Sequence, residues 1–351
     1  MLQGKRALVV GVANARSIAW GIANRWRQEG AEVFITYQNE RFRKPVEKLV
    51  RDSWGPYDAP GAPIPATACD VTDEEDIAQL WRTLQERGFC SSSSIGREDE
   101  SQEKQEKEEL EAGDGGGDFD GSPLLLEREG SILGRGRMQG GEPTKKTIDV
   151  ILHSVAHAPT DAMRQGFLMG TTRDAFVSAH VVSAYSLVST VRHALPFLSP
   201  GASVMALTYI GSQRQAAANY NVMGPAKASL ESCARALAAE LGGPRGEEGA
   251  LDSHGSGNNP PGGGGGGGGG VGPGGVRVNC LSAGPVRTMA ARGITGFDEM
   301  RREAAGRAPL GEGLAGVDEI AGVATFLASP LLSSAVTGQT VYADRGFSAV
   351  V

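Results

Sequence analysis

The sequence predicts an α/β fold built on a doubly wound parallel sheet. Seven short apolar runs, rich in Val and Ile, alternate with amphipathic helical patterns. Strands of this kind are buried on both faces, which requires helices on both sides of a parallel sheet. A barrel of parallel strands would alternate in the same way, but the count of seven strands and the glycine turn after the first of them favour the doubly wound sheet. We therefore expect ligands to bind outside the carboxyl ends of the strands.

Each element follows from its apolar pattern. Continuous apolar runs of five to seven residues predict strands at Ala7–Gly11, Glu32–Tyr37, Ile64–Cys69, Asp149–Ser154, Ser203–Tyr209, Val276–Ser282 and Gln339–Ala343. Apolar residues three and four apart predict helices at Ser17–Gln28, Arg41–Asp52, Glu74–Arg87, Thr172–Leu198, Ala218–Leu241 and Val317–Ala328.

Two segments interrupt this alternation. The chain is dense in charge, Ser and Gly from about residue 90 to 146, and from about 243 to 275 it includes nine consecutive glycines, Gly262 to Gly270. Such composition buries too little apolar area to offset the entropy of ordering, so we expect two disordered insertions within a single domain. Both lie between a helix and the next strand, at the sheet edge opposite the expected ligand site.

Composition narrows the function. The formal net charge is −7 and no basic stretch with interleaved aromatics occurs, which argues against nucleic-acid binding. No apolar run approaches the roughly 20 residues that cross a bilayer, so we expect no membrane insertion. The five histidines show no metal spacing, and no metal is expected. The widely spaced cysteines, Cys69, Cys90, Cys233 and Cys280, suit reduced thiols in a reducing compartment.

The turn after the first strand is a candidate phosphate site. Gly11 ends the strand, and the next helix starts at Ser17 and Ile18. A glycine there lets the backbone approach a pyrophosphate, and the helix N-terminus offers N–H donors and partial positive charge. The usual G-x-G-x-x-G is absent, so the spacing alone also fits an ordinary turn in which Ser17 caps the helix.

Several motifs resemble one enzyme family. Gly11-x5-Ser17-Ile18-Ala19-x-Gly21 resembles the divergent nucleotide loop of the bacterial and plastid enoyl-acyl carrier protein reductases, and Tyr220-x6-Lys227 resembles their Tyr-x6-Lys signature. Further matches occur in family order at Thr36–Asn39, Cys69–Val71, His153–Ala156, Leu207–Gly211 and Ser282–Thr288. The resemblance covers the chain end to end, apart from the two insertions.

The resemblance implies a Rossmann-type fold of the short-chain dehydrogenase/reductase superfamily. It also implies an activity, the reduction of the trans-2 double bond of an enoyl thioester on acyl carrier protein, with NADH, in the last step of a fatty-acid elongation cycle. The resemblance further implies a homo-oligomer, specifically a tetramer. No targeting segment is visible in this chain, and we expect the protein in the cytoplasm or the plastid stroma.

The tyrosine spacing fits this chemistry. Most short-chain dehydrogenases place Tyr and Lys four residues apart, but here Met223 stands four before Lys227 and cannot donate a proton. Tyr220 lies seven before Lys227, so on a continuous helix the two would share one face about 10 Å apart. That offset would bring the phenol to the thioester oxygen, two atoms beyond the β-carbon that receives hydride.

The resemblance then assigns the catalytic roles. Tyr220 would hydrogen-bond the thioester oxygen and stabilise the enolate. Lys227 would bind the nicotinamide ribose hydroxyls and, as a nearby cation, favour the ionised phenol. Tyr209, at the end of the fifth strand, would flank the substrate.

The residue after the second strand indicates which cofactor binds. An acidic residue there selects NAD and an arginine accommodates a 2′-phosphate; Gln38 matches the NADH-preferring members, while Arg41 and Arg43 either belong to a helix face or admit NADPH. The cofactor residues implied by the resemblance are Gly11, Ser17, Ile18, Gln38, Asp70, Val71, Ser154, Val155, Lys227, Pro285, Val286 and Thr288.

A segment of small apolar residues, Met289 to Phe297, resembles the family's substrate-covering loop, although a plain packed helix would have the same composition. The substrate residues implied by the resemblance are Ala158, Tyr209, Tyr220, Met223, Ala290, Ile294 and Phe297.

Three departures from the family pattern stand out. Tyr209 and Tyr220 are eleven residues apart where ten is usual, which puts the placement of Tyr209 in doubt. Arg345 replaces a small residue and affects the expected subunit interface, and His157 replaces an aromatic or apolar residue beside the substrate. Two other functions stay open: a carbonyl-reducing short-chain dehydrogenase, which Met223 argues against, and a nucleotide-binding relative that has lost catalysis.

Overall fold

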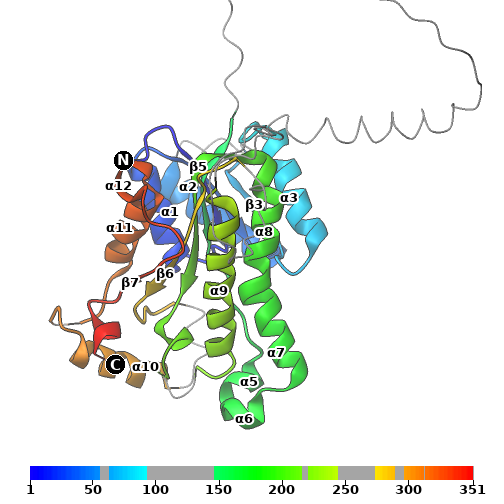
Figure 1. Cartoon of the computed structure of the whole chain (residues 1–351). Helices are drawn as coiled ribbons and strands as arrows, with labels where there is room; N and C mark the ends of the chain where they lie inside the picture. Colours follow the sequence, from blue (N-terminus) through cyan, green and yellow to red (C-terminus); the bar gives the residue numbers. More distant parts are fainter. Residues whose placement is uncertain are drawn as a thin grey trace, which may run out of the picture.

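The computed structural model describes residues 1–55, 63–92, 146–215, 220–243, 273–288, 296–311 and 313–350. Within them, one sheet of seven parallel strands has the order β3-β2-β1-β4-β5-β6-β7, with helices on both faces (Figure 1). The chain runs outward from β1 to β3, returns to pair β4 with β1, and then continues to the other edge. The predicted doubly wound, Rossmann-type sheet is confirmed, and its reversal point lies between β1 and β4.

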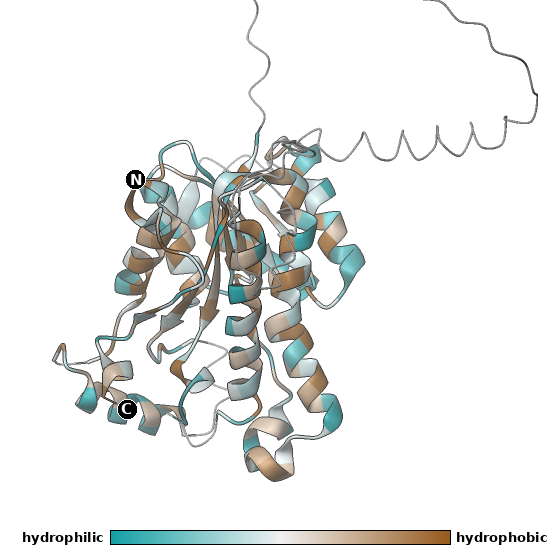
Figure 2. Ribbon diagram, in the orientation of Figure 1, coloured by the Kyte–Doolittle hydropathy of each residue, from teal (hydrophilic) through white to brown (hydrophobic). Residues whose placement is uncertain are grey.

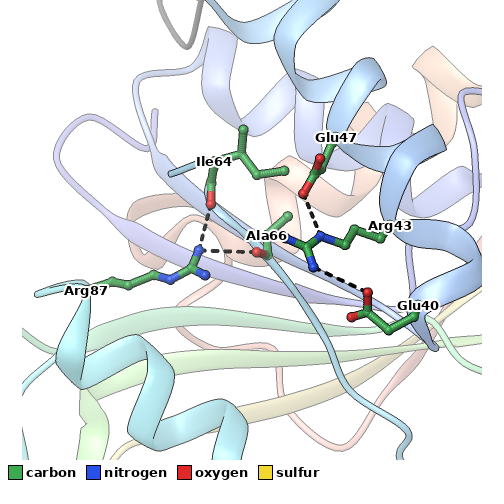
Figure 3. Close-up of polar contacts among 6 residues, drawn as sticks. All are labelled: Glu40, Arg43, Glu47, Ile64, Ala66 and Arg87. Atoms are coloured by element: carbon green, nitrogen blue, oxygen red, sulfur yellow. Dashed lines mark hydrogen bonds and ion pairs between the residues drawn. The ribbon is translucent and has the colours of Figure 1, made fainter. Parts of the chain in front are cut away.

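All seven predicted strands are present. They span β1 Arg6–Val10, β2 Glu32–Tyr37, β3 Ala66–Ala68, β4 Ile148–His153, β5 Leu198–Thr208, β6 Arg277–Ala283 and β7 Thr340–Ala343. The edge strand β3 is shorter than predicted. Just before it, the Ile64 carbonyl accepts from Ala66 N and from Arg87 Nη1, both at 2.8 Å, and not from a neighbouring strand (Figure 3). By contrast, β5 begins earlier, because a register shift in β4 lets Ile148 pair with Leu198.

The long predicted helices are also present, with changed ends. They are α1 Ile18–Gln28, α2 Glu40–Trp54, α3 Glu74–Glu86, α9 Met223–Leu241 and α11 Val317–Ala328. The helix predicted at Thr172–Leu198 is divided into α7 Arg173–His180, a π-helical turn η2 Val181–Tyr185 and α8 Ser186–Ala194. Several helices were not predicted: α5 Thr160–Arg164, α6 Gly166–Gly170, α10 Phe297–Arg307, α12 Pro330–Ser333 and the 3-10 turn η4 Ile210–Ser212.

The start of α9 corrects one prediction. The helix begins at Met223 and not at Ala218, because Asn221 adopts a left-handed conformation with φ +41°. The Asn221 amide donates to the carbonyls of Ala162 and Met163, at 3.2 and 3.1 Å, and so fixes this turn. Tyr220 therefore precedes the helix, and the expectation that it shares a helix face with Lys227 is wrong.

Two apolar layers hold the helices to the sheet. On one face α1, α2 and α11 cover the strands, and Trp20 stacks on Trp54 with ring centroids 4.9 Å apart. Gly21 allows α1 to approach α11, since a Cβ there would lie 2.0 Å from Val317 Cγ1. On the other face α3, α8 and α9 pack, and Trp81 stacks on Phe197 at 5.0 Å. Figure 2 shows the apolar residues gathered on the strands between these layers.

The predicted insertions lie, except for their ends, outside the described residues. At the first, Ser91 N donates to Lys146 O at 2.7 Å and Lys146 N donates to Ser91 Oγ at 3.0 Å. At the second, Gly275 N donates to Gly243 O at 3.3 Å. These ends lie at the amino ends of β4 and β6, opposite the carboxyl edge of the sheet. Cys90 is buried in the core and so does not belong to the first insertion.

No helix in the described ranges has the length and apolarity of a membrane span.

Candidate active site

A cavity of about 350 Å³ opens at the carboxyl edge of the sheet. It lies among the ends of β4, β5 and β6, the start of α1, and helices α5 and α10. Its lining includes predicted residues from both the cofactor and the substrate sets: Ile18, Ala158, Tyr209, Tyr220, Met223, Pro285, Val286, Thr288 and Phe297. The fold thus brings these distant segments together where ligands of doubly wound sheets bind.

Two tyrosines meet in this cavity. Tyr209 follows β5 directly, Tyr220 precedes α9, and their rings pack edge to face with centroids 5.0 Å apart. The Tyr209 hydroxyl donates to Met300 Sδ at 3.3 Å. Gly211 lies beneath the Tyr220 ring, since a Cβ at this glycine would be 2.5 Å from Tyr220 Cδ1. The extra residue in the intervening loop therefore does not remove Tyr209 from the cavity.

Both phenols are protonated donors at neutral pH. Burial raises the pKa of Tyr220 above its ordinary value, and Tyr209 and Glu231 raise it further. Burial also raises the pKa of Tyr209 to about 12, with Asp344 and Glu303 adding to the effect. The expectation that Lys227 would favour the ionised Tyr220 differs from this result, because desolvation of a phenolate dominates in the buried site.

Lys227 lies on the first turns of α9 and is buried. Its Nζ donates to the Leu207 carbonyl at 2.7 Å. Burial lowers the pKa of Lys227 to about 8, against the smaller opposing effects of Cys280 and Glu231. An ammonium has three N–H donors, and among the described residues Leu207 takes one. Lys227 itself is not among the residues that line the cavity.

The turn after β1 has no room for a side chain. Gly11 has φ +100°, and a Cβ there would lie 2.6 Å from Ser154 O and 2.9 Å from Val155 Cγ2. The Gly11 N–H donates to Thr36 Oγ1 at 3.2 Å, which ties the ends of β1 and β2 together. Ser17 caps α1 by accepting from Trp20 N at 3.3 Å. The ordinary turn in which Ser17 caps the helix is therefore present. Helix α1, which follows this turn, brings Ile18 into the cavity.

A family model described as Enoyl-(Acyl carrier protein) reductase matches residues 11–89, 142–246 and 270–348. The chain belongs to this family. The match skips most of both predicted insertions and includes every described wall of the cavity.

Relatives extend over the same length. This reductase is 30% identical over 347 residues to the NADH-dependent enoyl-acyl carrier protein reductase FabI of Bacillus cereus, covering 99% of this chain and 98% of the relative. It is also 30% identical to Escherichia coli FabI, over 99% of this chain and 95% of the relative.

Solved structures agree. The B. cereus reductase, crystallised with NADP+ and indole naphthyridinone, superposes with a TM-score of 0.68 at 30% identity, covering 100% of this chain and 98% of that one. The reductase of Anaplasma phagocytophilum in complex with NAD gives a TM-score of 0.67 at 26% identity, covering 99% and 95% of the two chains.

The other predicted cofactor residues of the reductase lie along the same sheet edge, outside the cavity. Gln38 is exposed after β2, and Ser154 follows β4. Asp70 follows β3, where its Oδ1 accepts from both the backbone and the hydroxyl of Thr72, at 3.0 and 2.7 Å; the adjacent Val71 is buried. Together with Gly11, these residues follow the carboxyl ends of β1, β2, β3 and β4.

The contacts of Arg43 decide between the two interpretations given for it, a residue of a helix face or one that admits NADPH. Its guanidinium donates to Glu47 Oε1 at 2.9 Å and to Glu40 Oε2 at 3.4 Å, on the exposed face of α2 (Figure 3). Arg43 therefore belongs to a helix face. Arg41 is exposed in the first turn of the same helix, where its backbone N donates to Asn39 Oδ1.

The structure shows the contacts of two residues that depart from the family pattern, Arg345 and His157. Arg345 has φ +57° and donates from Nη2 to Glu319 Oε1 at 3.1 Å. His157 is exposed on the cavity wall, and Ser183 Oγ holds its backbone at both N, 3.1 Å, and O, 3.3 Å.

Some residues that line the cavity were not predicted from the sequence. Thr208, Ala283 and Gly284 lie inside motifs that were recognised, so their neighbours gave a usable signal. Thr160, Met163 and Met300 lie on short helices that were not predicted. Ala290 and Ile294, predicted substrate residues, fall outside the described residues, while Phe297 begins α10. In the described part of the chain no group of three or more His, Cys, Asp or Glu is placed to hold a metal.

Proposed function

We propose that this enzyme reduces the trans-2 double bond of an enoyl-acyl carrier protein thioester with NADH, the last step of a fatty-acid elongation cycle. The observation that carries the proposal is that Tyr220 and Met223 line the same cavity. The position that a carbonyl-reducing relative would fill with a proton donor holds a thioether, and the phenol stands before the helix instead.

Tyr220 has the properties that the reaction needs. When bound, NADH would supply the hydride that the β-carbon accepts; negative charge would then develop on the thioester oxygen until a proton from solvent reaches the α-carbon. A buried, protonated phenol donates a hydrogen bond to that oxygen in surroundings of low dielectric constant, where such a bond is worth several kcal/mol. Tyr209 packs against the Tyr220 ring and restricts its orientation.

The remaining predicted residues hold the cofactor. Lys227 directs its remaining N–H donors to the ribose hydroxyls, and Gly11 and the start of α1 receive the pyrophosphate. NADH is preferred, because Gln38 occupies the specificity position and Arg43 is paired with two carboxylates. NADPH is the alternative cofactor, because the exposed Arg41 can accommodate its 2′-phosphate, and a B. cereus relative was crystallised with NADP+.

A homotetramer and an acyl carrier protein partner complete the proposal. The described surface exposes an apolar set along α6 and α7 (labelled in Figure 1) and on η2 that a second copy would cover: Phe167, Leu168, Met169, Phe176, Val177 and Tyr185. We place the enzyme in the cytoplasm or the plastid stroma, as its resemblance to bacterial and plastid reductases implies.

One assay tests the activity. The purified chain is mixed with NADH and either a trans-2-enoyl thioester of acyl carrier protein or the 3-ketoacyl thioester. We expect loss of NADH absorbance with the enoyl thioester. Oxidation of NADH with the 3-ketoacyl thioester alone would indicate a carbonyl reductase, and NADH binding without turnover of either would indicate a catalytically silent relative.

A further inference from the structure

Glu231 is a buried carboxylate to which the mechanism above gives no role. It lies on α9, one helical turn after Lys227, and is 3% exposed. Burying an ionised carboxylate is costly unless its oxygens are hydrogen-bonded. Glu231 accepts from three neutral side chains: Thr208 Oγ1 at 2.7 Å, Ser212 Oγ at 2.5 Å and Gln213 Nε2 at 3.2 Å.

All three donors belong to one short segment. Thr208 is the last residue of β5, Ser212 ends η4, and Gln213 follows it. Tyr209 lies between the first donor and the other two. A single carboxylate therefore holds the chain on both sides of Tyr209, with Oε1 shared by Thr208 and Ser212.

The same segment also supports Tyr220. Gly211, within η4, lies so close to the Tyr220 ring that a Cβ would meet Tyr220 Cδ1 at 2.5 Å and Tyr209 Cδ1 at 3.2 Å. A displacement of this turn must therefore move both rings. One turn earlier on α9, Lys227 donates to Leu207 O, so the helix binds the consecutive residues Leu207 and Thr208 at the end of β5.

We infer that Glu231 is a positioning residue, which fixes Tyr209 and Tyr220 for catalysis through the segment Thr208–Gln213. The inference rests on the function proposed above. Stabilising a developing oxyanion demands a donor held within a few tenths of an ångström. Release of the segment should consequently lower kcat, while the cofactor residues on β1, α1 and β4 keep their places.

The test compares Glu231→Gln with Glu240→Gln, a matched control at an exposed position of the same helix. An amide keeps the shape, but its NH2 group faces hydroxyl and amide donors and cannot accept from all three. We expect kcat with the enoyl thioester to fall on the order of tenfold to a hundredfold, with an unchanged Kd for NADH when both are measured well below pH 8, where Lys227 stays an ammonium in the variant as well. Glu240→Gln should behave as the wild type.

Hydrogen exchange gives a readout that does not depend on activity. The Ser212 and Gln213 amides donate to Tyr209 O and Ile210 O, both at 3.0 Å. In Glu231→Gln a peptide covering residues 207–215 should exchange faster, and peptides from β1 and β4 should not. Ser212→Ala should add little to the kcat loss in the Glu231→Gln background, because the two act on one contact.

Wild-type kcat in a folded Glu231→Gln protein would overturn the inference. So would a kcat loss matched by an equal loss of NADH affinity with unchanged exchange at 207–215, since that is general destabilisation. If Glu231→Gln does not fold, the Thr208→Val, Ser212→Ala double variant carries the same expectations. If the wild type reduces no enoyl thioester, the proposed function fails, and the exchange result alone decides whether Glu231 holds the segment.

Discussion

Tyr209 and Tyr220 meet edge to face, with ring centroids 5.0 Å apart and an interplanar angle of 61°, although they come from different elements. Tyr209 directly follows β5, and Tyr220 begins the turn into α9. The two phenols differ in their contacts, since Tyr209 donates to Met300 Sδ on α10 while the Tyr220 ring lies on Gly211. Their roles can therefore be separated by substitution.

Replacing Tyr220 with Phe should lower kcat by about 10²- to 10³-fold while the Kd for NADH stays unchanged. The variant loses a donor that acts mainly in the transition state, and a loss of that size is typical of an oxyanion donor. Steady-state kinetics and a fluorescence titration with NADH measure the two constants. Tyr209→Phe is the control, and we expect a smaller loss from it. Full turnover by Tyr220→Phe would contradict the mechanism.

Replacing Lys227 with Met should weaken NADH binding as well as turnover, because its ammonium contacts the cofactor. Lys48→Met, on the exposed surface of α2, should leave both unchanged. An unaltered Kd for NADH in Lys227→Met would show that Lys227 contributes only to packing and does not contact the cofactor.

NADH affinity should fall as pH rises through about 8. The pKa of Lys227 is lowered to about 8, so the ammonium predominates below that pH and is lost above it. The titratable groups facing Lys227 are Glu231 on α9 and the thiol of Cys280 on β6. Burial raises the pKa of Cys280 to about 12 and lowers the pKa of His153 on β4 to about 3, so both are neutral near pH 8. Titrating NADH binding against pH in wild type and Lys227→Met checks this, because the variant should lose the step.

Asn221→Ala should destabilise the protein by about 1–3 kcal/mol, through two lost hydrogen bonds and a left-handed conformation that alanine tolerates poorly. Asn221→Gly tolerates the backbone conformation but lacks the bonds. Urea unfolding of the two variants separates strain from bonding. Equal stability of Asn221→Ala and wild type would show that the turn is held by other contacts.

Deleting residues 93–145 and 247–272, each bridged by a short Gly/Ser linker, should leave kcat and KM nearly unchanged. Loop closure depends only on the logarithm of loop length, and the ends of the first gap already lie together through Ser91 and Lys146. Kinetics with acyl carrier protein thioesters are the measurement. A variant that binds NADH but loses activity only with the carrier-bound substrate would show that the insertions recruit the carrier.

The five inner strands β1, β2, β4, β5 and β6 were predictable because nearly all of their residues are buried, which gives each a continuous apolar run. The start of α9 was not, because Asn221 is fixed by the carbonyls of Ala162 and Met163, which lie far away in sequence. Helices such as α5, of five residues, are too short to show a period. In α10 only Met300 and Ala304 are buried, which leaves no apolar stripe. The contributions of Met163 and Met300 to the cavity depend on these helices.

The bonded pair Ser91 and Lys146 also means that the polypeptide need not be continuous between them. β4 pairs with β1 along its length, and Asp149 accepts from Lys5 Nζ and from Arg6 N, both at 2.9 Å. A chain cleaved by a protease anywhere in 93–145 should stay assembled as two fragments, neither of which is functional by itself. Such a protein would migrate as two bands in denaturing gels and still elute as one species under native conditions.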